Sequence, residues 1–350
     1  MRAAVMRDSK IVVEEVPDPE PQAGEILVRS LACGICGSDL HALQHTDEMV
    51  QASLEAGAPS VMDPGRDVIM GHEFCAEVVD RGPSTSDRLK TGTRVVHPAM
   101  LPRGGQIHGI GYSNDIPGGF AELMVLSEAM AVPVPEALPP EQAALTEPTA
   151  VGLHAVAQSR INAGASAVVL GCGPVGLAVI AGLRLQNVEP IVAADFSPLR
   201  RSLAERLGAH VVVDPASQTA LAAWNGSGGT HPPTVFECVG VPGVIQEIIR
   251  DAPRQARIVV VGVTMGEDRI KPMVAIVKEL SIRFSFGYSL EEFAETLHAI
   301  ADGRIEVAPL ITGRVGLDGV AGAFEDLSNP VEHVKILVEP GGQDGQQEGR

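Results

Sequence analysis

A glycine-rich segment, Gly171-Cys-Gly-Pro-Val-Gly176, constrains the fold of this chain more than any other feature. It follows an apolar run at 167–170 and opens a longer apolar run of helical character, after which another short apolar run ends at Asp195. Glycines in this strand–turn–helix context permit a tight turn, close approach of the backbone to a pyrophosphate and close packing of helix on strand. The helix N-terminus adds unpaired N–H groups for phosphates. We therefore predict a dinucleotide site that uses Gly171, Gly173, Pro174, Val175 and Gly176.

The same alternation of short apolar runs and helical segments continues after Asp195. Ser197 suits a helix cap, Pro198 suits the first turn, and Gly208 can end the helix. Further strands are expected at 210–213, 234–238, 257–261 and 281–286. Together these elements predict an α/β domain over residues 150–288 with a doubly wound parallel sheet of six strands.

Ligands of such sheets bind at the carboxyl ends of the strands. Asp195, at the end of the second strand, should accept hydrogen bonds from the adenosine ribose and repel a 2′-phosphate, so NAD is favoured over NADP. Arg200 and Arg201 could also lie near that ribose, although a solvated helix face is the more common role for such a pair. The loops that begin at Val239 and Val261 are expected near the nicotinamide.

The segments on either side of this domain have a different character. Residues 1–149 are rich in Pro and Gly with short alternating runs, which is typical of an irregular β-rich domain. A helix at 290–300 and a strand at 334–338 are expected to return to it, so that it comprises 1–149 and 289–340. The last ten residues lack apolar side chains, and we predict that 341–350 is a disordered tail.

Charge and cysteine content exclude several classes of protein. The chain has 26 Lys and Arg against 44 Asp and Glu, a net charge of -18. This charge argues against binding to nucleic acid or to anionic lipid, since both require clustered basic residues. No apolar stretch has the length of a signal peptide or a membrane span, so a soluble cytoplasmic protein is expected. Five scattered cysteines indicate reduced thiols rather than a disulfide framework.

Two short motifs carry a resemblance to a known family. They are Cys33-Gly-Ile-Cys36-Gly-Ser38-Asp39-Leu-His41 and Gly71-His72-Glu73, and the segments 118–122 and 147–152 match as well. With these motifs the chain resembles the zinc-dependent medium-chain dehydrogenases over nearly its whole length. The resemblance implies a GroES-like catalytic domain and a Rossmann domain, with zinc and an alcohol substrate in the cleft between them.

A catalytic zinc ion takes about three protein ligands and keeps one open position. The resemblance assigns two of these ligands to Cys36 and His72. Glu147, just before the Rossmann domain, resembles the family's third ligand. Glu73 is the competing ligand, because polyol-type members bring the glutamate of this motif to the metal. Asp39 is expected to orient the His72 ring through its far nitrogen.

Ser38 and His41 resemble the residues that form the proton path in this family. Ser38 would contact the substrate oxygen, and His41 would pass the proton to solvent. A serine after a tight turn often caps backbone, and a histidine is often a surface group, so structural roles are the alternatives. The expected reaction is hydride transfer between NAD and a secondary alcohol or polyol, a class indicated by the resemblance to polyol, butanediol and threonine dehydrogenases.

The sequence departs from many relatives in two places. No cysteine lies between Val95 and Gly118, so the four-cysteine lobe that holds a structural zinc is absent and one zinc per chain is expected. An insertion at 44–66 lengthens the gap between Cys36 and His72, and we expect it to shape the substrate entrance.

Two other functions stay open. A zinc-free reductase of the same superfamily would reduce quinones or enones with NADPH, and a non-catalytic nucleotide-binding protein would keep the fold without turnover. The complete ligand set and Asp195 argue against the reductase, and Ser38 with that ligand set argues against the non-catalytic protein. Relatives assemble as dimers or tetramers, so the resemblance implies a homodimer or homotetramer, with no nucleic acid or membrane partner.

Overall fold

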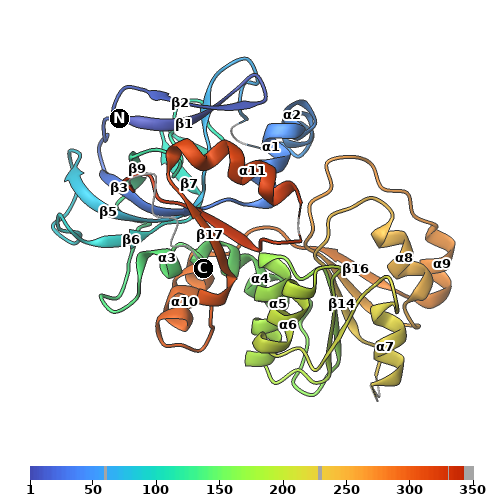
Figure 1. Ribbon diagram of the computed structural model, residues 1–350. Helices are drawn as coiled ribbons and strands as arrows, with labels where there is room; N and C mark the ends of the chain where they lie inside the picture. Colours follow the sequence, from blue (N-terminus) through green and yellow to red (C-terminus); the bar gives the residue numbers. More distant parts are fainter. Residues whose placement is uncertain (59–60, 228–230, 330, 343–350) are drawn as a thin grey trace.

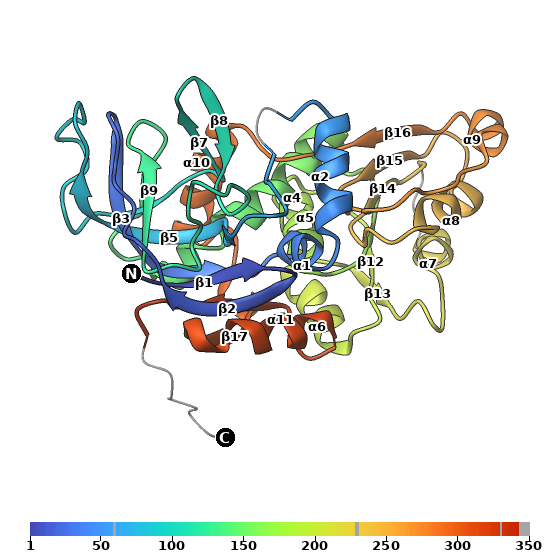
Figure 2. The same ribbon diagram turned by 90° about the horizontal axis from the view of Figure 1, so that it is seen from above.

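The computed structural model describes residues 1–350 except 59–60, 228–230, 330 and 343–350. Most of the segment predicted to be disordered, 341–350, therefore lies outside the described residues. The described part contains two large sheets toward opposite ends of an elongated molecule (Figures 1 and 2). No helix among these residues combines the length and the apolar character needed to cross a membrane.

A parallel sheet of six strands forms one end of the molecule. Its order is β13-β12-β11-β14-β15-β16, so the chain winds outward in both directions from the central pair. Every neighbouring pair is parallel. The strands are β11 (Ala167–Leu170), β12 (Ile191–Ala194), β13 (Val211–Val213), β14 (Thr234–Glu237), β15 (Arg257–Val260) and β16 (Ser281–Phe284). The predicted doubly wound α/β fold is confirmed.

Helices cover both faces of this sheet (Figure 1). Along β11, Ala167 and Val169 enter one core and Val168 enters the other, as the two-residue period of a strand requires. The first core holds α4 (Thr146–Ser159), α5 (Pro174–Leu185) and α6 (Pro198–Leu207). The second core holds α7 (Ala220–Gly226), α8 (Val244–Asp251) and α9 (Pro272–Lys278). Burial on both faces explains why the central strands β11 and β12 are apolar throughout.

The local signals at α6 are confirmed. The Ser197 hydroxyl accepts a hydrogen bond from the Arg200 backbone N–H, and the helix ends before Gly208, whose φ is 121°. The last strand of the sheet is shorter than predicted, because β16 ends at Phe284 and the Phe286 side chain is 93 % exposed.

The second large sheet combines the two ends of the chain. Its order is β10-β6-β5-β3-β18-β17, and β9 also pairs with β3. Strand β18 pairs antiparallel with β3, placing Leu337 opposite Gly34. The C-terminal strand therefore lies beside the segment that leads into the Cys36 motif. The strands are β3 (Glu25–Gly34), β5 (Glu73–Arg81), β6 (Arg94–Val96), β9 (Leu123–Ser127), β10 (Val132–Pro133), β17 (Ile311–Val315) and β18 (Lys335–Val338).

Smaller elements surround this second sheet. They are β1 (Arg2–Arg7), β2 (Lys10–Glu15), β4 (Val68–Ile69), β7 (Met100–Arg103), β8 (Gln106–Gly109), α1 (Gly37–Gln44), α2 (Thr46–Glu55), α3 (Pro140–Ala143), α10 (Leu290–Ala301), α11 (Val320–Ser328) and two 3-10 turns, Ala308–Leu310 and Leu317–Gly319. Helix α2 belongs to the insertion at 44–66 and buries none of its residues.

Close packing at the glycine-rich turn leads to a first prediction. A Cβ added at Gly176 in α5 would lie 1.9 Å from the carbonyl oxygen of Gly171. Because backbone must then move, Gly176→Ala should lower the free energy of unfolding by about 1–3 kcal/mol in urea denaturation.

Gly322→Ala is the matched control, since Gly322 also lies in a helix, α11, and a Cβ there would meet nothing within 4 Å. It should raise the free energy of unfolding by about 0.4–1 kcal/mol. Equal stabilities of the two variants would contradict the packing described for Gly176.

Candidate metal and cofactor site

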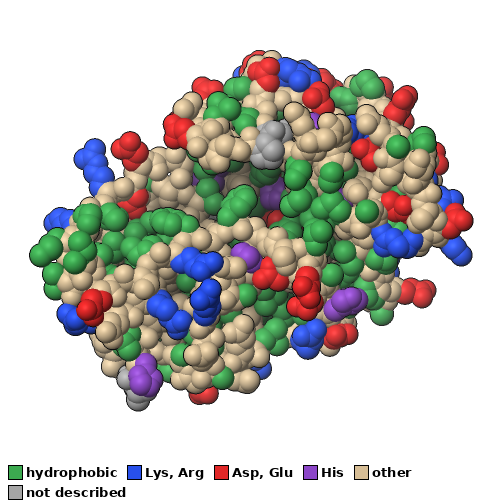
Figure 3. Space-filling model, turned by 180° about the vertical axis from the view of Figure 1, so that it is seen from behind, with side chains coloured by type: hydrophobic (Ala, Val, Ile, Leu, Met, Phe, Trp, Pro, Cys, Tyr) green, Lys and Arg blue, Asp and Glu red, His purple; other side chains and the backbone are tan. Residues whose placement is uncertain are grey.

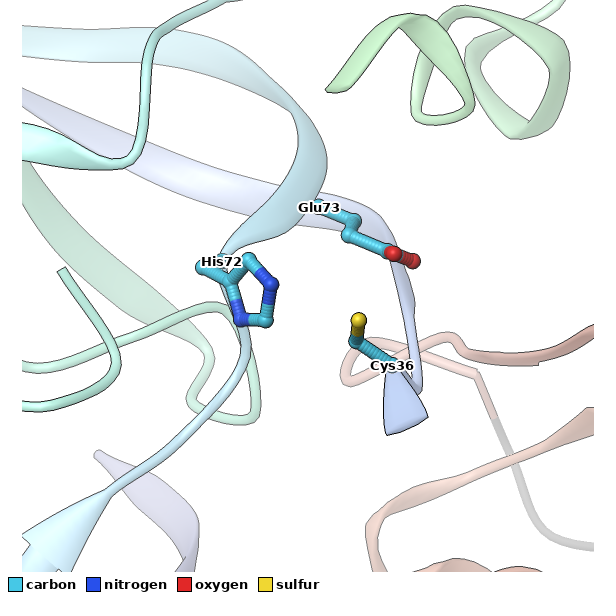
Figure 4. Close-up of side chains that lie close together, drawn as sticks. All are labelled: Cys36, His72 and Glu73. Carbon is cyan, nitrogen blue, oxygen red and sulfur yellow. The ribbon is translucent and has the colours of Figure 1, made fainter. Parts of the chain in front are cut away.

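Three potential metal ligands meet where β3, α1 and β5 join. Cys36 stands in extended backbone before the first turn of α1, with φ -94° and ψ 157°. His72 and Glu73 come together at the start of β5, the neighbour of β3 in the sheet. One donor atom from each of the three residues, a sulfur, a nitrogen and an oxygen, lies within 4.8 Å of the others (Figure 4). The fold thus gathers a thiol, an imidazole and a carboxylate at one point.

The donor group is largely buried, and some of its polar atoms lack partners. His72 and Glu73 are 5 % and 1 % exposed, while Cys36 is half-buried. Glu73 Oε1 accepts no hydrogen bond within the described residues. A buried oxygen without a partner is costly unless it binds something. Cysteine, histidine and carboxylate are the ligands that zinc prefers, so the residues present fit that ion.

Asp39 supports this group from behind. It is fully buried, and its Oδ2 accepts a hydrogen bond of 2.9 Å from the Cys36 backbone N–H. Its Oδ1 lies 3.3 Å from His72 Nδ1, which is an ion-pair distance, although the alignment is not that of a hydrogen bond. Burial lowers the pKa of His72, but the attraction of Asp39 and Cys36 outweighs burial and raises it well above the usual value.

Lys335 is a member of the site that sequence reasoning missed. Its Nζ donates to Glu73 Oε2 at 2.5 Å and to the Ile35 carbonyl at 2.9 Å, and the side chain is 1 % exposed. Burial lowers the pKa of Lys335, yet the attraction of Glu73 raises it overall, so the lysine keeps its positive charge. The available signal was a lysine inside the apolar strand β18, a position where a charge needs a partner.

Glu147 lies close to this group without being one of its three members. It stands in the first turn of α4 and is 8 % exposed. Burial raises the pKa of Glu147 to about 7, the charge of His72 lowers it, and that of Glu73 raises it further. The phenol of Tyr288 lies near this carboxyl, and Tyr288 is a second residue that sequence reasoning did not single out. The structure therefore brings both candidate third ligands into the same region.

The two residues expected to move a proton lie on α1. Ser38 Oγ is 2.8 Å from the hydroxyl of Tyr112. His41 lies one turn further along and packs its ring against His45, with ring centroids 6.2 Å apart. Partial burial lowers the pKa of His41. Among the described residues, no hydrogen bond joins Ser38 to His41.

The glycine-rich turn has the geometry that a phosphate site needs. Gly171 has φ 86°, which favours glycine, and Gly173 caps α5 from extended backbone. The Arg200 guanidinium reaches to within 3.9 Å of the position that a Gly173 Cβ would occupy. Its Nη2 donates to the His333 carbonyl, and its buried Nε has no hydrogen-bond partner in the described part of the chain.

Asp195 and Arg201 are held by backbone groups. The Asp195 carboxylate accepts hydrogen bonds of 2.8 Å from the backbone N–H groups of Cys172 and Ser197. Arg201 donates to the carbonyls of Asp195 and Phe196. These bonds fix Asp195 at the edge of the glycine-rich turn. Of the two arginines, it is Arg200 whose side chain reaches that turn.

The loops that begin at Val239 and Val261 follow β14 and β15 directly. Glu237, at the end of β14, accepts hydrogen bonds from the backbone N–H groups of Val239 and Gly240 at 2.7 and 2.9 Å. A Cβ added to Gly262 in the second loop would lie 2.3 Å from Gly240 N, so the two loops touch. Glu237 is a third residue that the sequence alone did not reveal.

On the face drawn in Figure 3 the surface is hollowed between the two ends of the molecule. Hydrophobic and histidine side chains gather around this hollow.

Comparison with known proteins agrees with this geometry. A model described as alcohol dehydrogenase GroES-like domain matches residues 22–136, and one described as zinc-binding dehydrogenase matches residues 174–302. The (R,R)-butanediol dehydrogenase of Bacillus subtilis is 33% identical over 97% of this chain and 100% of its own length. The chain belongs to the zinc-binding alcohol dehydrogenase family. The predicted resemblance is therefore confirmed.

Other family members extend the comparison. The sorbitol dehydrogenase of Bacillus subtilis is 28% identical over 97% of both chains. Among solved structures, the 2R,3R-butanediol dehydrogenase from Bacillus subtilis superposes with a TM-score of 0.82 at 31% identity, covering 97% of this chain and 99% of that one. A zinc-binding dehydrogenase from Sinorhizobium meliloti bound to NADP gives the same TM-score and coverage at 30% identity.

The buried Lys335–Glu73 pair leads to a second prediction. Lys335→Met keeps an apolar stem but leaves the Glu73 carboxylate buried without its cation. We expect the free energy of unfolding of chelator-washed protein to fall by about 3–5 kcal/mol, because an uncompensated buried charge is costly. Urea denaturation followed by circular dichroism measures the change.

Arg254→Met is the matched control, because Arg254 pairs with Glu279 on the surface, where the side chains are 62% and 56% exposed. It should change stability far less, since exposed pairs contribute little. Similar losses in Lys335→Met and Arg254→Met would show that the buried pair does not stabilise the fold.

Proposed function

We propose that this protein is a zinc-dependent dehydrogenase that transfers a hydride between NAD and a secondary alcohol or polyol. The observation that carries the proposal is the donor group of Cys36, His72 and Glu73, whose sulfur, nitrogen and oxygen atoms lie within 4.8 Å of one another. This mixture of donors suits a catalytic zinc site. The names of two relatives, a butanediol and a sorbitol dehydrogenase, support secondary-alcohol chemistry.

Cys36 and His72 are the proposed zinc ligands, with Glu73 or Glu147 as the third. The unpartnered Oε1 supports Glu73, and burial beside His72 and Glu73 supports Glu147. A zinc ion held here would act as a Lewis acid and lower the pKa of an alcohol hydroxyl. Asp39 would keep the His72 ring in place, as carboxylates beside ligating histidines commonly do.

The alcohol must also lose its proton. We propose that Ser38 receives this proton at Oγ as it releases its own hydroxyl hydrogen, and that His41 passes a proton on to solvent. The half-buried position of Ser38, two residues after Cys36, supports the first role. The lowered pKa of His41 supports the second, because a neutral imidazole can take up a proton near neutral pH.

The glycine-rich turn, with Arg200 beside it, is the proposed binding site for the cofactor pyrophosphate. Asp195 would face the adenosine ribose, and Val239 and Val261 would lie near the nicotinamide. A carboxylate at Asp195 disfavours a 2′-phosphate, which supports NAD. NADP is the alternative, because one relative at 30% identity was solved with it.

We also infer that residues 1–149 and 289–340 form the catalytic domain, that residues 150–288 form the cofactor domain, and that the chain assembles as a homodimer or homotetramer. The two large sheets draw their strands from these separate sets of residues, which supports the division. Exposed apolar side chains at the β16 edge and on α9 support assembly, namely Phe284, Phe286, Met273 and Ile276.

A panel of secondary alcohols and polyols tests the function directly. The purified protein is incubated with each compound and either NAD or NADP, and NADH or NADPH formation is followed by absorbance. We expect turnover of vicinal diols or polyols, with a higher kcat/KM for NAD. Reduction of quinones or enones with NADPH, and no alcohol oxidation, would contradict the proposal.

Two cysteine variants test the role of the donor group. Cys36→Ala should reduce kcat/KM by more than about 100-fold. Mutating a residue that only supports a metal ligand costs up to about 100-fold, and loss of a ligand itself should cost more. Cys75→Ala is the control, because Cys75 is fully buried in the apolar core and is not a member of the donor group. A fully active Cys36→Ala enzyme would rule out the proposed metal site.

A further inference from the structure

The chain contains two tyrosines, and each reaches a residue of the proposed site. Burial and the charge of the nearby Glu147 raise the pKa of Tyr288. The Tyr112 hydroxyl lies 2.8 Å from Ser38 Oγ and 3.2 Å from Asp39 Oδ1, and its ring centroid is 5.1 Å from that of His72. Tyr112 thus touches the proposed proton acceptor and the carboxylate behind the metal ligand at once.

The backbone around Tyr112 is firmly placed. Its N–H donates to the Gly109 carbonyl at 3.2 Å, and the buried Ile110 donates to Ala99 at 3.1 Å. Gly111 has φ 82°, and a Cβ there would lie 3.0 Å from the Gly71 nitrogen. This segment therefore packs directly against the residue that precedes His72, which fixes the tyrosine relative to the donor group.

The hydrogen-bonding groups around Tyr112 give its hydroxyl a defined role. Burial and the nearby Asp39 raise the pKa of Tyr112, so the phenol keeps its proton. The Tyr112 hydroxyl donates to Ser38 Oγ at 2.8 Å, and Asp39 Oδ1 lies 3.2 Å from the same Tyr112 oxygen. With Tyr112 as the donor, one Ser38 lone pair is occupied and the other is left for a substrate hydroxyl. The Ser38 hydrogen is then free to leave along the proton path.

We propose that Tyr112 is a positioning residue for the reaction, whose hydroxyl fixes the orientation of the Ser38 hydroxyl by linking it to the buried Asp39 carboxylate. This inference rests on the proposed function, because Ser38 matters only if an alcohol proton must leave. It predicts that Tyr112 acts through Ser38 and does not contribute to holding the metal.

The test is a set of four enzymes: wild type, Tyr112→Phe, Ser38→Ala and the double variant. Tyr112→Phe removes one oxygen and keeps the ring. We expect its kcat to fall about tenfold, which corresponds to ~1.4 kcal/mol of transition-state stabilisation, with KM changed by less than about twofold, since the lost interaction orients Ser38 during the chemical step. The Ser38→Ala and double variants should have the same kcat, because non-additivity marks residues that act as a unit.

Two further measurements separate positioning from a general structural effect. The zinc content of Tyr112→Phe should match that of the wild type, and its melting temperature should fall only by the few degrees that loss of one buried hydrogen bond costs. Thr296→Val is the control for loss of a buried hydroxyl, because Thr296 donates to the Glu292 carbonyl inside α10 and is 2 % exposed. It should keep the wild-type kcat.

Three outcomes would overturn the inference. The first is an unchanged kcat in Tyr112→Phe. The second is a Tyr112→Phe substitution that lowers kcat by the same factor in the wild type and in Ser38→Ala. The third is loss of zinc from Tyr112→Phe. Failure of the proposed function is recognised separately, because the wild type would then oxidise no alcohol in the panel. If the wild type oxidises an alcohol and Tyr112→Phe is equally active, the inference about Tyr112 is wrong while the proposed function stands.

Discussion

Burial of several acidic groups around one point is the constraint on which the site depends. Cys36, Asp39, Glu73 and Glu147 lie together, and the three carboxyl side chains are at most 8 % exposed. Negative charge removed from water needs compensation from cations or hydrogen-bond donors. Lys335 and the Cys36 backbone N–H supply part of it. A divalent cation among the donors would supply the rest, and this explains why the fold tolerates such a group in its interior.

The architecture delivers these groups from distant parts of the chain. The antiparallel pairing of β18 with β3 brings Lys335 beside Glu73, 262 residues earlier in the sequence. The parallel sheet presents Gly171, Asp195 and the Glu237-bound loops at the carboxyl ends of its strands, the edge where ligands bind in such folds. One sheet thus builds the donor group, and the other presents the glycine-rich turn and the loops around it.

Local signals in the sequence were sufficient for the parallel sheet, and family resemblance indicated the donor group. Ser197 and Gly208 marked the ends of α6 because capping depends on nearby residues. The resemblance pointed to Cys36 and His72, with Glu147 as the third ligand and Glu73 as its competitor. Lys335, Tyr112 and Glu237 were not predicted, because their roles come from contacts that no periodicity encodes: Tyr112 meets Ser38 across 74 residues, and Glu237 bonds the backbone of its own loop. The choice between Glu73 and Glu147 depends likewise on three-dimensional placement.

The central claim is that the buried donors hold one catalytic zinc ion, and elemental analysis of purified, chelator-washed protein tests it most directly. The donor geometry predicts about one zinc per chain, since one group of Cys36, His72 and Glu73 is present among the described residues. The same analysis on Cys36→Ala should find much less zinc. A wild-type protein that is folded and free of zinc, even after growth and purification with added zinc, would contradict the account.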